Sequence, residues 1–198
     1  MGETDPMTGV TLRTERLVLR PWRPEDRAPF AEMNADPAVM EHFPAPLSPE
    51  ESDALVDRIE QRMAEQGGWG LWAVEVPGVA PFVGFIGLNP GDAAVGRPCI
   101  EVGWRLAAAY WGRGYAPEGA LAAMEHGFEE IGLDEIVSFT VPGNTKSRRV
   151  MEKIGLTFVE EFDHVALTAQ GHPLHRHVLY RMDAATWSDR WRNSVTHR

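Results

Sequence analysis

Stretches in which apolar and polar residues alternate, or in which apolar residues run together, recur along the chain. Both patterns are typical of β-strands, with one or both faces buried. Apolar residues spaced by three or four, which are typical of amphipathic helices, lie between these stretches. The patterns predict about seven strands, at residues 10–20, 69–76, 82–88, 100–106, 135–141, 156–165 and 177–182. They predict helices from Pro24 to Asp36, over 50–65, from about 115 to 131, and over 145–154.

Capping residues support two of these helices. Ser48, Pro49 and Glu51 form the capping-box pattern at the start of the helix over 50–65. Gly155 follows the helix over 145–154, where a glycine commonly ends a helix. The helix over 50–65 is expected to turn Leu55, Ile59 and Met63 inward, and the helix after Pro24 carries Phe30, Met33 and Asn34.

The order of the elements is strand, two helices, three strands, helix, strand, helix and two strands. Consecutive strands are typical of antiparallel pairing, and strand–helix–strand units are typical of parallel pairing. The order therefore predicts an α/β (α+β) fold with a mixed, mostly antiparallel sheet flanked by helices. We expect one domain over residues 1–198, with a core from about 10 to 183 and polar tails.

Composition narrows the class of protein. The chain has 198 residues, 43% of them hydrophobic and 24% charged, which is typical of a soluble globular protein. A net charge of −10 argues against nucleic-acid partners and is compatible with a cationic substrate such as an amine. The single cysteine, Cys99, excludes an intramolecular disulfide. We expect no membrane span and no signal peptide, because Met1–Pro6 is polar and acidic, and hence a cytoplasmic protein.

A glycine turn between a strand and a helix carries the clearest chemical signal. Gly112 and Gly114 follow the strand over 100–106, and the helix after them has Pro117 in its first turn. A helix N-terminus after such a turn presents free N–H groups and the positive end of the helix dipole, both of which favour phosphate. The turn predicts a site for a phosphorylated cofactor.

A histidine group near the C-terminus could be mistaken for a metal site. His172, His175 and His177 lie close in sequence, but no carboxylate has the spacing to complete a ligand set, so we expect no metal. The acidic run Glu160, Glu161 and Asp163 could attract a cationic acceptor, or it could be a solvated strand edge.

Three segments resemble a known family. They are residues 12–21 (LRTERLVLRP), 110–118 (YWGRGYAPE) and 144–156 (NTKSRRVMEKIGL). In this order and on these elements they resemble the GNAT superfamily of acyl-CoA-dependent N-acetyltransferases, and specifically its RimJ/RimL branch. The resemblance implies acetyl-CoA as co-substrate, with fourth and fifth strands that splay apart so that the pantetheine arm pairs with the fourth.

The resemblance also implies a set of cofactor contacts. The pyrophosphate would lie on backbone N–H groups of the glycine turn, although Ala109 stands where the family has Gln or Arg. Asn144 would bind the pantetheine arm or only cap its helix, and Trp104, Arg105 and Leu106 would face the arm. The implied cofactor-binding residues are Trp104, Leu106, Trp111, Gly112, Arg113, Gly114, Tyr115, Ala116, Asn144, Ser147 and Arg149.

The catalytic residues are less clear. Met151 stands where many relatives have a tyrosine that protonates the leaving thiolate, but Ser147 matches the serine of the RimJ/RimL branch and could hydrogen-bond that thiolate. An amine nucleophile must lose a proton, for which Glu101 is the first candidate base and His177 the second.

The acceptor side is the least determined. Phe43, Trp69, Asn89 and His177 are candidates to line it, and Trp72 is a further one. The sequence predicts acetyl transfer to a primary amine by direct attack. The acceptor could be a protein N-terminus, as in ribosomal-protein acetylation, or a small amine such as an antibiotic, an amino acid or a polyamine. A CoA-binding regulatory or structural protein without turnover is the alternative, and a homodimer stays open.

Overall fold

The computed structural model describes residues 9–192 and places them in two compact units. The first unit comprises Met1–Gly87 and Trp104–Gly119, and the second comprises Leu88–Gly103 and Ala120–Arg198. Two strands, β4 (Ala80–Pro90) and β5 (Ile100–Leu106), have residues in both units. Within residues 9–192, no helix combines the length and the apolar character that crossing a membrane requires.

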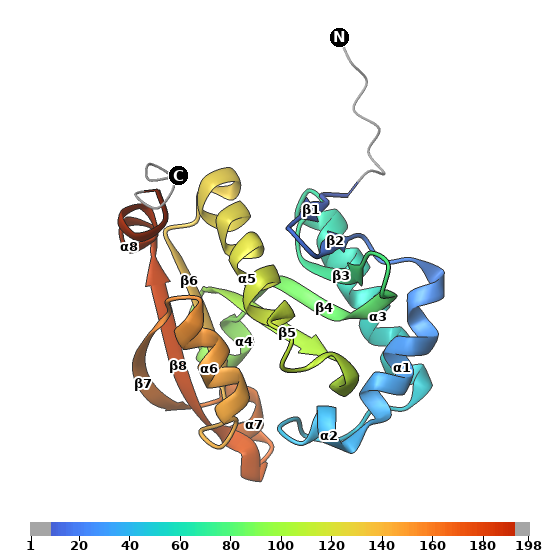
Figure 1. Cartoon of the computed structure of the whole chain (residues 1–198). Coiled ribbons are helices and arrows are strands. Elements are labelled where there is room, and N and C mark those ends of the chain that lie inside the picture. Colours follow the sequence, from blue (N-terminus) through green and yellow to red (C-terminus); the bar gives the residue numbers. More distant parts are fainter. Residues whose placement is uncertain (1–8, 193–198) are drawn as a thin grey trace. The chain divides into compact units, whose positions relative to one another are not determined.

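The strands of the first unit are hydrogen-bonded in the order β1 (Leu12–Arg13), β2 (Val18–Arg20), β3 (Leu71–Val76), β4 and β5. β1 to β4 are antiparallel (Figure 1). The prediction of one strand over 10–20 is wrong, because Thr14 and Leu17 close a turn between β1 and β2. The Thr14 N–H donates to the Leu17 carbonyl at 3.0 Å, and the Leu17 N–H donates to Thr14 Oγ1 at 2.9 Å.

The helices of the first unit are α1 (Arg27–Ala35), α2 (Pro37–Met40) and α3 (Pro49–Glu65), and a 3-10 turn at Pro24–Asp26 precedes them. The capping box of α3 is confirmed, with Glu51 N 3.2 Å from Ser48 Oγ and Ser48 N 2.8 Å from Glu51 Oε2. The buried stripe of α3 is Ser52, Val56, Ile59 and Met63. The expectation for Leu55 is therefore wrong by one position, since Val56 takes the inward place.

Four rings form the aromatic core of the first unit. Phe30 of α1 packs edge-on against Trp22 at 4.9 Å, Phe85 at 6.1 Å and Phe82 at 6.3 Å between ring centroids. The helices α1 and α3 also pack against each other (Figure 1). Packing of this kind fixes the position of α1, and with it the position of the polar residue Asn34 at its C-terminal end.

The strands of the second unit follow the order β4, β5, β6 (Glu135–Thr140), β8 (Arg176–Asp183) and β7 (Thr157–Asp163). β8 is antiparallel to both β6 and β7. β5 runs parallel to β6, and within the described residues the two strands share one register pair, Glu101 with Val137. So short a pairing is what strands that splay apart would show. The mixed sheet therefore has eight strands, which confirms the predicted fold class. The hairpin β1–β2 accounts for the strand beyond the expected seven.

The helices of the second unit frame its part of the sheet. α5 (Tyr115–Glu125) begins in the first unit, continues into the second, and widens to π-helical turns over His126–Ile131. α6 (Thr145–Lys153) packs against β6 and ends before Gly155, whose φ is +87°. The sequence did not indicate the short helices α4 (Asp92–Val95) and α7 (Val165–Ala169). The short helix α8 (Ala184–Trp187) lies in the tail after Asp183, which the sequence predicts to be helical or frayed.

Candidate active site

The glycine turn after β5 has the backbone that the sequence predicts. Gly112 and Gly114 have φ values of +74° and +82°, in the left-handed region that favours glycine. A Cβ on Gly112 would meet no atom within 4 Å, so the conformation, not crowding, requires glycine there. Within residues 9–192, the N–H groups of Gly112, Arg113 and Gly114 donate to no backbone carbonyl. The turn therefore presents consecutive free donors directly before α5.

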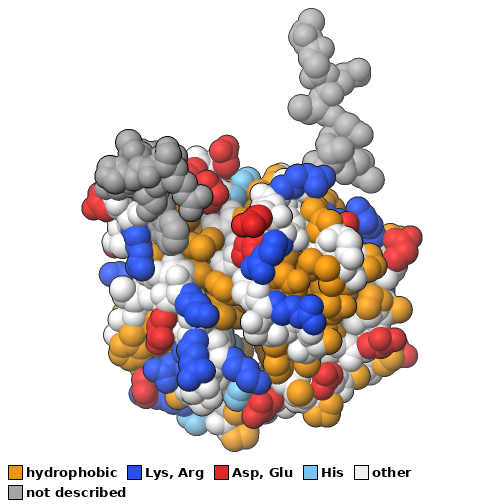
Figure 2. All heavy atoms as spheres, in the orientation of Figure 1, with side chains coloured by type: hydrophobic (Ala, Val, Ile, Leu, Met, Phe, Trp, Pro, Cys, Tyr) orange, Lys and Arg blue, Asp and Glu red, His pale blue; other side chains and the backbone are white. Residues whose placement is uncertain are grey.

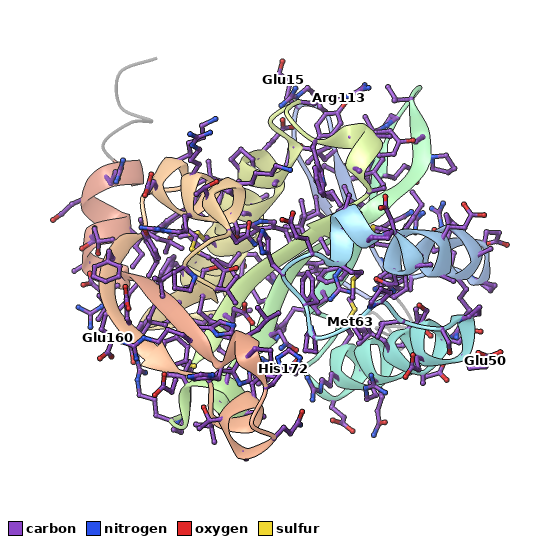
Figure 3. The ribbon with its side chains drawn as sticks, turned by 90° about the horizontal axis from the view of Figure 1, so that it is seen from below. Glu15, Glu50, Met63, Arg113, Glu160 and His172 are labelled. Carbon is purple, nitrogen blue, oxygen red and sulfur yellow. The ribbon has the colours of Figure 1, made fainter. Side chains whose placement is uncertain are left out.

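Glu118 and Arg16, a pair that no sequence pattern indicates, hold this turn in place. Glu118 Oε1 accepts from Thr14 Oγ1 at 2.6 Å, and Glu118 Oε2 accepts from Arg16 Nε at 2.7 Å. Arg16 Nη1 donates to the carbonyl of Arg113 at 2.9 Å, and Figure 3 shows Glu15 beside Arg113. Burial alone would raise the pKa of Glu118, but the bonds from Thr14 and Arg16 hold it below its usual value. The carboxylate thus anchors the hairpin β1–β2 to the start of α5.

The other predicted cofactor residues of the first unit divide into packed and open side chains. Leu106 and Tyr115 are buried, so contact with a cofactor would fall to their backbone atoms. Trp111 Nε1 donates to the Leu106 carbonyl at 2.7 Å, which fixes the end of β5. Trp104 and Ala116 are partly exposed, and Arg113 is exposed, with its guanidinium 5.7 Å from the centre of the Tyr110 ring.

Asn144 and Ser147 of the second unit lie at the start of α6. Asn144 caps the helix, since its Oδ1 accepts from the Ser147 N–H at 3.2 Å and its Nδ2 donates to Thr140 Oγ1 at 3.0 Å. Within residues 9–192, the half-buried Ser147 hydroxyl has no hydrogen-bond partner. The cap is therefore filled, while the hydroxyl next to it is available to a ligand.

α6 also carries a basic face. Figure 2 shows Lys and Arg side chains gathered over this helix. Arg148 is tied down, because its Nε donates to Tyr180 Oη at 3.2 Å and its Nη1 donates to the Pro142 carbonyl at 3.2 Å. Arg149 and Lys153 are exposed, so they are the better candidates to meet a phosphate.

Glu101 lies in β5, in the second unit. Burial raises the pKa of its carboxyl to about 8, and within residues 9–192 it has no ion-pair or hydrogen-bond partner. Its Oε1 lies 3.6 Å from the place where a Cβ on Gly103 would stand. A carboxyl of this kind releases its proton near the pH at which many amines begin to lose theirs, which suits a general base.

His177 lies in an aromatic cluster of the second unit. Its ring is 5.1 Å from His164, 5.8 Å from Phe162 and 6.1 Å from Phe139, between ring centroids. Burial lowers the pKa of His177, and its Nδ1 lies 3.1 Å from the His175 carbonyl. A neutral His177 therefore carries its proton on Nδ1 and a free electron pair on Nε2. Among the described residues, no group of three or more His, Cys, Asp or Glu is placed to hold a metal ion.

The predicted acceptor residues fall into both units. Phe43 and Trp69 belong to the first unit, and Asn89 belongs with His177 to the second. Asn89 Nδ2 donates to the Pro90 carbonyl at 3.0 Å. Trp72 is fully buried and donates to the Val10 carbonyl at 2.8 Å, so the prediction that it lines the acceptor site is wrong.

Phe43 adjoins Arg105, a half-buried cation that the family resemblance places against the pantetheine arm. The guanidinium carbon of Arg105 lies 4.0 Å from the centre of the Phe43 ring and 5.5 Å from that of Phe85. Arg105 Nη1 donates to Asn34 Oδ1 at 2.7 Å, and Asn34 Nδ2 donates to Ser52 Oγ at 3.0 Å. We call Arg105, Asn34, Phe43 and Phe85, all in the first unit, the Arg105 cluster. The sequence contains one sign of this cluster, since Asn34 is a polar residue on an apolar helix face.

Known proteins show the same fold and sequence family. The sequence profile of the acetyltransferase (GNAT) domain matches residues 16–157. The FsC-acetyl coenzyme A-N(2)-transacetylase of Aspergillus fumigatus is 35% identical over 161 residues, which are 77% of this chain and 67% of that protein. The uncharacterised N-acetyltransferase YnaD of Bacillus subtilis is 31% identical over 146 residues, 73% of this chain and 81% of that protein.

A solved structure supports the same family. The GNAT-family acetyltransferase from Bacillus anthracis matches with a TM-score of 0.73 and 26% identity, over 89% of this chain and 99% of that one. The chain therefore belongs to the GNAT acetyltransferase family. Proteins of this family transfer an acetyl group from acetyl-CoA to an acceptor.

Proposed function

We propose that the chain is an N-acetyltransferase that moves the acetyl group of acetyl-CoA to a primary amine by direct attack in a ternary complex. The glycine turn at Gly112–Gly114 carries this proposal. Its two positive φ values and its free N–H groups suit the pyrophosphate of CoA. The names of two relatives, an N(2)-transacetylase and an N-acetyltransferase, support nitrogen as the accepting atom.

The donor half of the reaction uses groups of each unit. In the first unit, the N–H groups from Gly112 to Ala116 would hold the pyrophosphate, because the Trp111 N–H donates to the Ala108 carbonyl at 3.2 Å. The strand end at Trp104–Leu106 would pair with the pantetheine arm. In the second unit, Asn144 would bind the arm and Arg149 the nucleotide phosphate. The serine at position 147 and the segments 12–21, 110–118 and 144–156 support the finer assignment to the RimJ/RimL branch.

The chemistry needs one proton removed and one thiolate stabilised. An ammonium group passes a proton to Glu101, directly or through water, and the neutral nitrogen attacks the thioester carbon. A C–N bond forms and the C–S bond breaks. The nitrogen then loses a second proton, which passes to the thiolate, and CoA leaves as the free thiol. The Ser147 hydroxyl would donate a hydrogen bond to the sulfur as negative charge develops on it. Positioning of the amine beside the thioester supplies most of the acceleration.

The test is release of free thiol from acetyl-CoA in the presence of a panel of amines. We expect amine-dependent release together with one new amide in the product. Saturable CoA binding without release for any amine would contradict the proposal and favour the alternative, a CoA-binding protein without turnover. The cytoplasmic location and the homodimer stay predictions from the sequence.

A matched pair of glycine variants tests the cofactor site itself. Gly112→Val and Gly78→Val place the same side chain at φ values of +74° and +75°, each with no atom within 4 Å of the new Cβ. Both variants carry the same backbone strain, so their stability should fall alike. Only Gly112→Val should lose CoA affinity, measured by calorimetry. Equal CoA affinity in the two variants would refute the phosphate-binding turn.

A further inference from the structure

Arg105 is a half-buried cation, and no acidic residue among residues 9–192 pairs with it. Within residues 9–192 its guanidinium forms no ion pair, and its one hydrogen bond, from Nη1, goes to the neutral oxygen of Asn34. Its Nε is buried and has no hydrogen-bond partner among the described residues. A buried donor left unpaired costs free energy, and a buried charge costs more. An unpaired buried donor of this kind indicates a hydrogen-bond partner that is not part of the protein.

The shape of the unfilled edge indicates what would complete it. The Nε–H bond and one N–H bond of Nη2 lie within the guanidinium plane and point the same way, along one edge of the group. This edge can bind both oxygens of a carboxylate at once. Nη1, on the other edge, is already held by Asn34. The rings of Phe43 and Phe85 lie over the guanidinium, which fixes its plane and leaves the edge as the place for an anion. Burial lowers the pKa of Arg105 to about 10, so it stays charged at neutral pH.

Among residues 9–192, no carboxylate forms an ion pair with Arg105, and Asn34 cannot fill the open edge. Asn34 is occupied on both sides, with Oδ1 accepting from Arg105 and Nδ2 donating to Ser52. The side chain of Arg105 and the ring of Phe43 keep some solvent exposure, and the segment after Phe43, from Pro44 to Ala45, is exposed. The Arg105 cluster therefore reaches the protein surface at Phe43 and this segment.

We propose that Arg105 binds a carboxylate of the amine acceptor through its Nε–Nη2 edge, so that the natural acceptor is an amino acid or another small amine that carries a carboxylate. This inference rests on the proposed function, because it names the acceptor of the same reaction. An acceptor with both charges also agrees with the net charge of −10, which favours the ammonium end. Polyamines, which have no anionic group, are excluded as the preferred acceptor.

The test compares amino acids of increasing distance between amine and carboxylate with their carboxamides. Thiol release is measured at equal concentrations of neutral amine, which removes differences in amine pKa. We expect the wild type to prefer the best carboxylate over its carboxamide by roughly 10- to 100-fold in kcat/KM, as for a charged hydrogen-bonded pair. Arg105→Met should lose this preference, and Arg105→Lys should regain part of it. Arg27→Met, which removes a half-buried cation of α1 that pairs with Asp57, should keep it.

The outcomes separate the inference from the proposed function. Thiol release with no preference for carboxylates would overturn the inference and leave acetyl transfer standing. If Arg105→Met lowers kcat/KM equally for the carboxylate and the carboxamide, Arg105 has a structural role. If Arg105→Met loses CoA affinity, the anion that Arg105 binds belongs to the cofactor. Either result overturns the inference. Calorimetric binding of the amino acid but not of its carboxamide, lost in Arg105→Met, would support it even if no amine released thiol.

Discussion

Two arginines of the first unit differ in how the protein surrounds them. Arg20 makes five hydrogen bonds, to Asp26 at 2.8 and 2.9 Å, to Glu75 at 3.0 Å, and to the carbonyls of Pro21 at 3.1 Å and Pro81 at 2.7 Å. These use every N–H donor that a guanidinium has. Arg105 makes one such bond, to Asn34, and its buried Nε makes none within residues 9–192.

The pKa values of the two side chains shift in opposite directions for this reason. The hydrogen bond of Asp26 raises the pKa of Arg20, whereas burial lowers the pKa of Arg105 to about 10. The Arg20 network is complete without a ligand and therefore serves the fold. The Arg105 cluster is incomplete, and its open edge is the feature that distinguishes a binding residue from a structural one.

The largest expected effect is on stability. Arg20→Met leaves Asp26, with 2% of its surface exposed, without its cation, so the free energy of unfolding should fall by about 3–5 kcal/mol. Arg105→Met removes an unpaired charge but leaves the buried Asn34 oxygen without its donor, so that free energy should fall by less than about 2 kcal/mol. Urea unfolding of both variants measures the difference. A loss in Arg105→Met as large as that in Arg20→Met would erase the distinction between the two sites.

The second prediction converts one site into the other. Asn34→Asp gives Arg105 a carboxylate of the chain's own, 71 residues away in sequence, and makes it resemble Arg20. The variant should lose roughly tenfold or more in kcat/KM for carboxylate-bearing amines, because its own anion competes for the guanidinium. Its activity on the matching carboxamides should not fall. Unchanged kinetics for both acceptors would show that the guanidinium binds no substrate anion.

The third prediction concerns Glu101, which lies on the same strand as Arg105 and also lacks a partner within the described residues. The reacting complex is the one in which Glu101 holds the proton that it took from the ammonium group, so the rate per neutral amine follows the protonated fraction of this carboxyl. With a pKa of about 8, this rate should be nearly level below pH 7 and fall roughly fivefold from pH 8 to pH 9. Glu101→Gln should flatten the profile. The same fall in the Gln variant would remove Glu101 from proton transfer.

The smallest effect is expected at Ser147, another unfilled donor. Ser147→Ala should lower kcat several-fold, roughly 3- to 10-fold, while leaving CoA affinity and stability unchanged. Ser48→Ala is the contrasting variant, because Ser48 Oγ caps α3 by accepting from Glu51. That variant should lose about 1 kcal/mol of stability and no turnover. An unaltered kcat in Ser147→Ala would exclude its hydroxyl from the reaction.

The sequence predicted local features well and distant partners poorly. The strand over 100–106, the glycine turn at 112 and 114, and the Ser48 cap each depend on neighbouring residues, and the structure has all three. The prediction of a single strand over 10–20 was wrong because a turn between Thr14 and Leu17 divides it. This turn lies inside an alternating pattern that contains no Gly or Pro to mark it.

The partners of the site could not be read from one sequence for a physical reason. Arg105 meets Asn34, and Arg16 meets Glu118, across 71 and 102 residues respectively. Such pairs are set by how helices and strands pack, and no local pattern encodes them. A polar Asn34 between buried Phe30 and Met33 and the end of α1 showed only that something polar must lie opposite.

The most direct measurement is the NMR signal of the arginine Nε–H groups during titration with the preferred amino acid. Arg20 serves as the internal reference, because its Nε already donates to Glu75. The Arg105 Nε–H signal, assigned with Arg105→Lys, should move downfield toward the Arg20 signal as the amino acid saturates the protein, and should not move with the carboxamide. An Arg105 signal that stays in place at saturation would contradict the assignment of Arg105 as the carboxylate-binding residue.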